Sequence, residues 1–487
     1  LDWSRLINTS LGDAESLKAL LIHPPCEREI YQRFLGLTAP PTGLAYVAAA
    51  LERDHENEVK IIDMPAERKD ITKVKKEIET FKPDMLGVYC ATYRVNHANQ
   101  VINATKEVDA SIKTLMGGPH ASLLAEDVLK ENPNLDAVVC GEGDITVPEL
   151  ANAWESGELA KVKGIVFRES GNVVRNPPRP LIDDLDGLPY PARHLLPMDK
   201  YRLFGTFRMA TMVSSRGCPY GCHYCSVSAI YGRKWRARSA KNVVDEMEHL
   251  CDSYDLDLIM FFDDNFDLDR KRTESICDEI TERGLEIPWG YESSIMSTDR
   301  HHLKKLREAG CRILSYGIET TSQKSITTMK KDISTREMKE VMDNSKELGM
   351  LRIANVILGL PGETREDVME SIDLMKELEP EYPLFFLPTP YPGTKFHETA
   401  EKMGMIKELD WSKYTTANPI LETQELSLKE VRELNTKAYK DFYLRPIVIK
   451  NNLRMLSKFI KSGVIKPRHM PGLAYHQMKT WLWLVRM

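Results

Sequence analysis

At roughly 100–200 residues per domain, the chain of 487 residues is long enough for about two to four domains. Its composition, 42% hydrophobic and 28% charged, is that of a folded protein, and its net charge of −6 argues against a protein that reads nucleic acid. No apolar run approaches the roughly 18 residues of a membrane-spanning helix. The nine cysteines are unevenly spaced, which argues against an extracellular disulfide framework, so we expect a multi-domain cytoplasmic enzyme.

Residues 1–175 alternate short apolar runs with amphipathic stretches of helical length. This pattern is typical of an α/β domain in which helices cover both faces of a parallel sheet. Residues 176–200 are expected to form a linker, because 176–191 contain five prolines. The predicted strands of the first domain are 18–23, 59–63, 85–90, 114–117 and 137–140.

Residues 201–400 repeat the alternation, with six β/α units. Six such units predict a partial or full parallel barrel, and barrels of this kind carry their chemistry at the carboxyl ends of the strands. Residues 401–487 are expected to be a mostly helical region near the substrate. The predicted barrel strands are 211–214, 258–262, 289–293, 313–317, 352–358 and 384–387.

The end of the chain is basic. From Pro446 to Met487 there are eight Lys and Arg residues and no Asp or Glu, and four apolar residues recur at helical spacing: Ile449, Leu453, Leu456 and Ile460. One interpretation is a helix whose apolar stripe packs on the barrel. The other is a basic face that guides an acidic substrate or partner to the barrel mouth, with Trp481 and Trp483 adding apolar contact.

A cysteine triplet carries the strongest functional signal. Cys218, Cys222 and Cys225 follow the first predicted barrel strand with the spacing C-x3-C-x2-C. Three thiolates on one loop can bind three irons of a 4Fe–4S cluster and leave the fourth iron open for substrate chemistry. The alternatives are a zinc site, which would need His223 as its fourth ligand, and three unrelated buried cysteines.

The triplet resembles the hallmark of the radical S-adenosylmethionine (SAM) enzymes, which carry it on a partial (β/α)6 barrel. Further matches are residues 261–265 (FFDDN), 316–320 (YGIET) with Lys330, 355–364 (NVILGLPGET) and 390–394 (PYPGT). The resemblance implies that SAM chelates the open iron and is cleaved to methionine and a 5′-deoxyadenosyl radical. It assigns four residues to SAM binding: Tyr224, Glu319, Gly359 and Pro361.

The first domain resembles the Rossmann-like cobalamin-binding domain of the class B radical SAM methyltransferases and anaerobic Mg-protoporphyrin cyclases. The matching segments are 40–44 (PPTGL), 117–122 (GGPHAS), 141–144 (GEGD) and 188–191 (LPYP). The resemblance implies base-off cobalamin across the strand ends. The cofactor-binding residues expected there are Thr42, Gly43, Thr92, Tyr93, Gly117, Gly118, Pro119, His120, Gly141, Glu142 and Gly143.

One departure affects the cobalt. The D-x-H-x-x-G motif, which supplies a histidine to cobalt in other cobalamin proteins, does not occur in this chain. We therefore expect His120 to hydrogen-bond the cofactor tail or the loop backbone rather than to coordinate the metal.

The family resemblance implies a C-methyltransferase that moves a methyl group from SAM, through methylcobalamin, to an unactivated carbon. The carbon can belong to a peptide or protein, such as a glutamine of methyl-coenzyme M reductase, or to a small molecule. Two alternatives stay open: oxidative ring closure on a tetrapyrrole with the same cofactors, and an iron–sulfur sensor without enzymatic activity. The six other cysteines are isolated, so a single cluster is expected, reduced by a donor of the ferredoxin or flavodoxin type.

Overall fold

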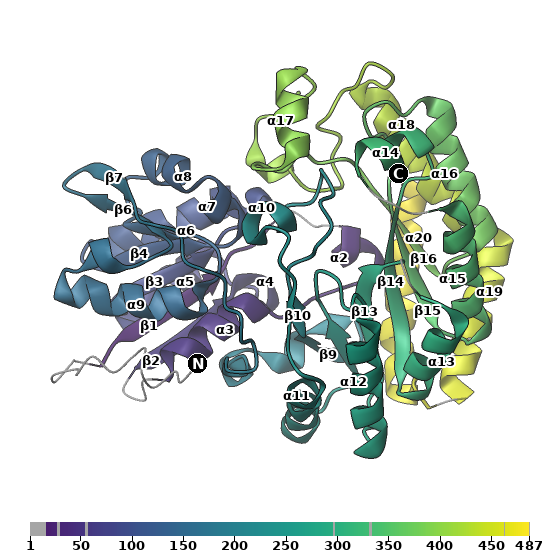
Figure 1. The fold of residues 1–487 in the computed structure, drawn as a ribbon, viewed down its shortest axis with the longest axis horizontal. Coiled ribbons are helices and arrows are strands. Elements are labelled where there is room, and N and C mark those ends of the chain that lie inside the picture. The colour runs from purple at the N-terminus through teal and green to yellow at the C-terminus, as the bar shows by residue number, and fades with distance from the viewer. Residues whose placement is uncertain are drawn as a thin grey trace. The chain divides into compact units, whose positions relative to one another are not determined.

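The computed structural model describes residues 16–26, 30–53, 57–295, 298–330, 334–461 and 463–486, so the first fifteen residues of the predicted first domain lie outside the described part. The chain divides into two compact units (Figure 1). Unit 1 comprises residues 1–27, 40–200 and 229–232. Unit 2 comprises residues 28–39, 201–228 and 233–487.

Unit 1 is built on a seven-stranded sheet with the order β2-β1-β3-β4-β5-β6-β7. The first five strands are parallel, as the alternating pattern predicts, and their apolar runs are buried on both faces. Two antiparallel edge strands, β6 and β7, were not predicted. The strands are β1 Lys18–His23, β2 Glu58–Asp63, β3 Met85–Tyr89, β4 Lys113–Gly117, β5 Ala137–Val139, β6 Ile165–Glu169 and β7 Asn172–Arg175.

The helices of unit 1 connect these strands and begin at clear caps where the sequence offers one. The Asp70 side chain, for example, accepts a hydrogen bond from the backbone N–H of Lys73 at the start of its helix. Residues 176–191 contain neither helix nor strand, in keeping with their prolines. The helices are α3 Thr42–Leu51, α4 Met64–Glu67, α5 Ile71–Phe81, α6 Val95–Val108, α7 Pro119–Leu123, α8 Ala125–Glu131 and α9 Gly143–Ser156.

Unit 2 contains an open sheet with the order β16-β15-β14-β13-β12-β9-β8. Six strands are parallel, one for each predicted β/α unit, and the short β8 pairs antiparallel with β9. The structure is thus a partial barrel. The strands are β8 Arg202–Leu203, β9 Phe207–Met212, β12 Leu258–Phe261, β13 Trp289–Ser294, β14 Cys311–Glu319, β15 Leu351–Ile357 and β16 Tyr382–Phe386, with a separate ribbon of β10 Ser215–Arg216 and β11 Arg236–Ala237.

Helices follow the strands along one face of this sheet (Figure 1). An aromatic cluster fills the space between sheet and helices, where Phe261, Phe266, Trp289 and Tyr291 pack with ring centroids 4.7–6.1 Å apart. The helices of unit 2 are α2 Ile30–Phe34, α11 Ala240–Ser253, α12 Arg270–Glu282, α13 Arg300–Glu308, α14 Gln323–Thr328, α15 Thr335–Glu347, α16 Arg365–Leu378, α17 Lys395–Lys402, α18 Leu428–Tyr443, α19 Pro446–Lys461 and α20 Met470–Arg486. The short helix α10, Val227–Tyr231, has residues in both units.

The C-terminal region is helical, as predicted, but three of the four residues of its predicted apolar stripe are exposed, and only Leu456 is half-buried. Ile449, Leu453 and Ile460 are 54%, 60% and 44% exposed, while Val448 and Phe459 of the same helix are buried. Helices α19 and α20 also border a cavity at the amino ends of the barrel strands. The expectation that the basic segment lies at the barrel mouth is therefore wrong, because the mouth is formed by the opposite strand ends.

Candidate functional site

The cysteine loop leaves the carboxyl end of β9, the first parallel strand of the partial barrel. Cys218, Cys222 and Cys225 are half-buried and form no disulfide. Gly217, just before the triplet, has φ +85°, and a Cβ there would lie 2.2 Å from the carbonyl oxygen of Lys234. Only glycine fits this position, because the backbone conformation and the close approach both exclude a side chain.

Two carboxylates after β12 hold the start of this loop. Asp263 is buried and accepts hydrogen bonds from the backbone N–H and hydroxyl of Ser214 at 2.7 and 2.6 Å and from the hydroxyl of Ser215 at 2.6 Å. Asp264 accepts one from the backbone N–H of Gly217 at 2.7 Å. These residues lie in the FFDDN segment, and they fix the backbone from which the three thiols project.

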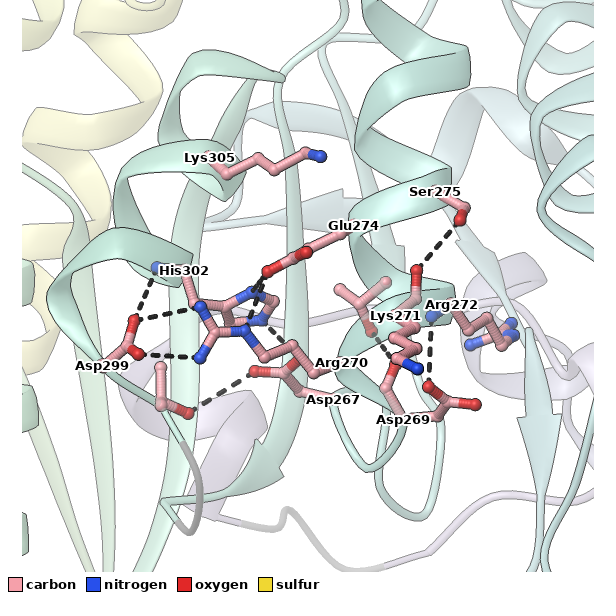
Figure 2. Close-up of polar contacts among 12 residues, drawn as sticks. Asp267, Asp269, Arg270, Lys271, Arg272, Glu274, Ser275, Asp299, His302 and Lys305 are labelled. Atoms are coloured by element: carbon pink, nitrogen blue, oxygen red, sulfur yellow. Dashed lines mark hydrogen bonds and ion pairs between the residues drawn. The ribbon is translucent and has the colours of Figure 1, made fainter.

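The loop that follows the FFDDN segment is anchored by a buried histidine, shown in Figure 2. His302 lies 2.7 Å from the carboxylate of Asp267 through Nε2 and 3.2 Å from that of Glu274 through Nδ1. Burial disfavours the charged imidazole, but the hydrogen bonds and ion pair with Asp267 and the hydrogen bond with Glu274 outweigh it and raise the pKa of His302. This ion-pair network connects α13 to α12 and to the loop that carries Asp263.

Two of the residues predicted to bind SAM meet in the structure. Tyr224 donates a hydrogen bond to the carboxylate of Glu319, and burial together with that charge raises the pKa of the phenol. Glu319 ends β14 with φ +66°, a strained conformation for a residue other than glycine, next to a shift in the strand register. The Tyr224 ring packs on an apolar cluster that includes Leu360 and Phe396.

The other two predicted SAM residues lie in the loop after β15. The loop is organised by Glu363, which is buried and accepts hydrogen bonds from the backbone N–H groups of Gly359 and Leu360 at 2.9 and 3.0 Å. It also accepts one from the hydroxyl of Thr320, beside Glu319, at 2.5 Å. Glu363 thus connects the loop after β15 to the YGIET segment at the end of β14. Pro361 lies in the same loop after β15 and is half-buried.

Polar groups also lie on the inner face of the sheet, opposite the helices. Glu292 of β13 and Ser315 of β14 are partners in the register and share a hydrogen bond, and burial raises the pKa of Glu292 to about 7. The amide of Asn355 donates to the Ser315 hydroxyl at 3.1 Å, and Tyr31 of α2 donates to the Asn355 carbonyl at 3.4 Å. The sequence signal missed here was a single carboxylate within the strand sequence WGYESS.

The donor chemistry of the cysteine loop fits an iron–sulfur cluster. Burial raises the pKa of the Cys218 thiol and raises that of Cys225 to about 12, so both thiols favour the protonated form. A bound cation reverses this preference, because it displaces the proton and binds the thiolate. Within the described ranges, no three His, Cys, Asp or Glu side chains converge as the ligands of a single metal ion would. In a cluster each thiolate binds a different iron, and the ligands need not converge on one point.

In unit 1 the predicted residues of the β4 loop surround a buried histidine. His120 lies 3.2 Å from the hydroxyl of Thr92 through Nδ1, and its backbone N–H donates to the carbonyl of Cys90 at 3.1 Å. Burial lowers the pKa of His120 to about 4, so the imidazole is neutral at pH 7. Gly118 has φ +109°, and a Cβ there would lie 2.9 Å from the same carbonyl, while Gly117 has more room and Pro119 begins α7.

The β5 loop borders a cavity of about 370 Å³ lined by Ser122, Gly141, Glu142 and Arg179 among others. A Cβ on Gly141 would meet no atom within 4 Å, whereas one on Gly143 would lie 3.0 Å from Val47. The Glu142 carboxylate accepts a hydrogen bond from the backbone N–H of Ile182 at 2.8 Å and so holds the linker against this loop.

The remaining predicted residues of unit 1 lie at helix starts. Thr42 and Gly43 open α3, and a Cβ on Gly43 would have no neighbour within 4 Å. Tyr93 follows Thr92 in a 3-10 turn after β3, where the Arg94 guanidinium lies over its ring. Thr92 and Tyr93 follow the carboxyl end of β3, and Thr42 and Gly43 begin the helix that comes between β1 and β2 in the chain. An open parallel sheet binds large ligands at the carboxyl ends of its strands.

Comparison with known proteins agrees with this organisation. Residues 212–375 match the Radical SAM superfamily and residues 33–151 match the B12 binding domain. An uncharacterized methyltransferase of Pyrococcus horikoshii is 36% identical over 95% of this chain and 99% of its own length. The anaerobic magnesium-protoporphyrin IX monomethyl ester cyclase of Rubrivivax gelatinosus is 28% identical over 87% of this chain and 79% of its own length.

Among solved structures, the radical SAM methyltransferase TsrM from Kitasatospora setae has a similar fold. Its TM-score is 0.66, at 20% identity, and the alignment covers 81% of this chain and 76% of that one. The thiol-bearing loop on a partial barrel and the glycine-rich parallel sheet thus define an enzyme that combines SAM radical chemistry with cobalamin. The chain belongs to the cobalamin-dependent radical SAM family, whose cofactors are a 4Fe–4S cluster, SAM and cobalamin.

Proposed function

We propose that the protein is a C-methyltransferase that moves a methyl group from SAM, through cobalamin, to an unactivated carbon of its substrate. The observation that supports it most is the presence, in one chain, of the cysteine loop with its Tyr224–Glu319 contact and of a cobalamin-binding domain. The similarity to a methyltransferase over nearly the whole chain supports methyl transfer to the substrate radical rather than another reaction of that radical, such as ring closure.

The residues of unit 2 take defined roles in this proposal. Cys218, Cys222 and Cys225 hold the cluster, and the carboxylate of Glu319, oriented by the Tyr224 hydroxyl, binds SAM. Glu363 fixes the loop of Gly359 and Pro361 against which the adenosine packs. When bound, the cofactors supply a deoxyadenosyl radical that abstracts hydrogen and a methyl group for the resulting carbon radical.

In unit 1 the proposed cobalamin contacts come from the strand ends. Gly117, Gly118 and Gly141 allow close approach to the backbone, and the cavity beside Gly141 and Glu142 is the proposed place for part of the cofactor. His120, neutral and bonded to Thr92, orders the β4 loop. The neutral Thr92 and Tyr93 side chains complete the proposed corrin contacts.

For the substrate we propose a peptide or protein side chain, with a glutamine such as that of methyl-coenzyme M reductase as the first candidate. The inner face of the partial barrel presents a carboxylate, a hydroxyl and an amide, from Glu292, Ser315 and Asn355, and these groups match the donors and acceptors of a side-chain amide. Because each turnover needs an electron, we also propose an external donor of the ferredoxin or flavodoxin type.

A single-turnover assay tests the proposal. The reconstituted protein, with SAM, reductant and a glutamine peptide, should release 5′-deoxyadenosine and add one methyl group to the peptide by mass spectrometry. Cys218→Ala, Cys222→Ala and Cys225→Ala should each abolish both products, whereas Cys251→Ala, a half-buried cysteine of α11, should not. Deoxyadenosine release with oxidative ring closure of a tetrapyrrole, and no methyl transfer, would favour the cyclase alternative that the Rubrivivax relative represents.

A further inference from the structure

Exposed apolar side chains are concentrated at the end of the chain. Twelve large hydrophobic residues of the described part are exposed, and nine of them lie on or beside helices α19 and α20. Those nine are Ile449, Leu453, Ile460, Met470, Tyr475, Met478, Trp481, Leu482 and Val485. Single exposed apolar residues need no partner, whereas their concentration on two successive helices indicates an interaction surface.

The helical spacing shows that each helix has separate buried and exposed apolar faces. In α19, Val448 and Phe459 pack inward, whereas Ile449, Leu453 and Ile460, spaced four and seven residues apart, lie along a neighbouring, exposed face. In α20, His476 and Leu484 are buried, and the exposed set covers a broad face that includes Trp481, Leu482 and Val485. The inward faces already hold the helices on unit 2, so the exposed faces serve something else.

The two exposed faces border one apolar cavity. It has a volume of about 390 Å³ and is lined by Leu453 of α19, Trp481 of α20 and the strand-end residues Phe207, Leu351 and Tyr382 among others. These strand-end residues belong to the amino ends of β9, β15 and β16, opposite the end that carries the cysteine loop. The surface is therefore distinct from the candidate active site.

Positive charge flanks the apolar faces. The last 42 residues contain eight Lys and Arg and no acidic residue, in a chain of net charge −6. Arg468 pairs with Asp255 and Asp257, but within the described ranges no ion pair engages the others. They are Lys450, Arg454, Lys458, Lys461, Lys466, Lys479 and Arg486.

We propose that α19 and α20 form a docking surface for an anionic lipid bilayer. Helices with a wide apolar face, Trp and Tyr at the polar boundary and flanking Lys and Arg lie in the bilayer interface, with the apolar face among the acyl chains and the cations at the headgroups. No described helix is long and apolar enough to cross a membrane, so the contact is peripheral.

A second copy of the chain is a poorer occupant. In a two-fold dimer through this face the same patch would meet itself, so the uncompensated lysines and arginines of one copy would lie near those of the other. A bilayer containing anionic lipids supplies both the apolar interior and the negative charge that the surface lacks.

Vesicle flotation of the full-length protein loaded with its cofactors tests this proposal. We expect it to float with vesicles of phosphatidylcholine mixed with an equal amount of phosphatidylglycerol, and to bind vesicles of phosphatidylcholine alone at least roughly tenfold more weakly. High salt should reduce binding to the mixed vesicles, because charge attraction is screened over a Debye length of about 8 Å at physiological salt.

Two sets of variants separate the charge from the apolar contribution. Reversing Lys450, Arg454 and Lys458 to Glu should weaken binding to the mixed vesicles by roughly tenfold or more. The matched control reverses three exposed lysines elsewhere, Lys76, Lys113 and Lys402, and changes the net charge equally with no effect on binding. Trp481→Ser with Leu453→Ser, both at exposed positions, should weaken binding while leaving all charges in place.

The readout needs no enzymatic activity, so the result does not depend on the proposed function. Equal flotation with neutral and anionic vesicles, or binding unchanged in both the charge-reversed and the Ser variants, would overturn the proposal. A dimer in light scattering that dissociates on Trp481→Ser with Leu453→Ser, together with absence of flotation, would assign the surface to a second copy instead.

Discussion

Removal of the Asp263 side chain should prevent assembly of the cluster without touching any of its ligands. This carboxylate accepts three hydrogen bonds from Ser214 and Ser215, immediately before the cysteine loop. In Asp263→Ala the three buried donors lose their acceptor, so the strand end that positions Cys218 is no longer fixed. The expected phenotype is a folded chain that retains little iron.

The structure sets the size of the effect. A buried donor left without a partner costs about 1–3 kcal/mol, so three donors cost at least about 3 kcal/mol of local stability. Asp263→Asn keeps one carbonyl oxygen for the Ser214 N–H, and the two serine hydroxyls can turn to accept from the new amide. We therefore expect Asp263→Asn to lose about 1 kcal/mol and to retain most of the cluster.

The assay is iron per chain and the visible absorption of the cluster after anaerobic reconstitution, with circular dichroism to confirm the fold. Asp269→Ala is the matched control, because Asp269 is a carboxylate of the same loop that caps α12 by accepting from Arg272 N–H. It should keep its cluster. If Asp263→Ala bound iron like the unmodified protein, the carboxylate would not be what positions the loop.

Three further predictions concern the cofactor loop and two titratable groups of unit 2, His302 and Glu292. Gly118→Ala should lower cobalamin affinity and cost about 1–3 kcal/mol, since it combines φ +109° with a Cβ 2.9 Å from the Cys90 carbonyl, whereas Gly171→Ala, at φ +82° with no neighbour within 4 Å, should leave cobalamin binding unchanged. The pKa of His302 is raised, so its ion pairs stabilise the fold fully below the unfolded pKa of about 6.5, and this stabilisation is lost as pH rises through the folded pKa. In denaturant titrations, His302→Gln should not show this loss of stability with rising pH. If the variant kept the pH profile of the unmodified protein, the prediction would be contradicted. Burial raises the pKa of Glu292 from 4.5 to about 7, so the free energy of unfolding should fall as pH rises between these values, and Glu292→Gln should remove that slope in the same titrations.

The sequence predicted the parts of the fold that follow from local patterns. Buried parallel strands are nearly continuous apolar runs, so all five strands of the first parallel set and all six of the partial barrel lie where the pattern placed them, within a few residues. Strands β6 and β7 were missed because sequences such as NVVR are short and half-polar. They become strands only by pairing with the sheet edge.

The site was predictable where residues close in sequence act together, and less so where partners are distant. The cysteine spacing indicated one loop, but the partner of Asp263 lies 49 residues away, and that of Glu363 lies 43 away, beyond any local pattern. Periodicity also identified the apolar stripe of α19, but it could not tell which face would pack inward. The structure shows that Val448 and Phe459 do so instead.

The central claim, that SAM serves as a methyl donor through cobalamin as well as a radical source, can be tested without knowing the substrate. The reconstituted protein is reduced in the presence of cobalamin and SAM carrying an isotopic label in its methyl group, and the extracted cofactor is examined by mass spectrometry. We predict that methylcobalamin carries the label and that one equivalent of S-adenosylhomocysteine forms with it. When the label is placed elsewhere in SAM, methylcobalamin should be unlabelled. Cleavage of SAM to 5′-deoxyadenosine with no label on cobalamin would contradict the account.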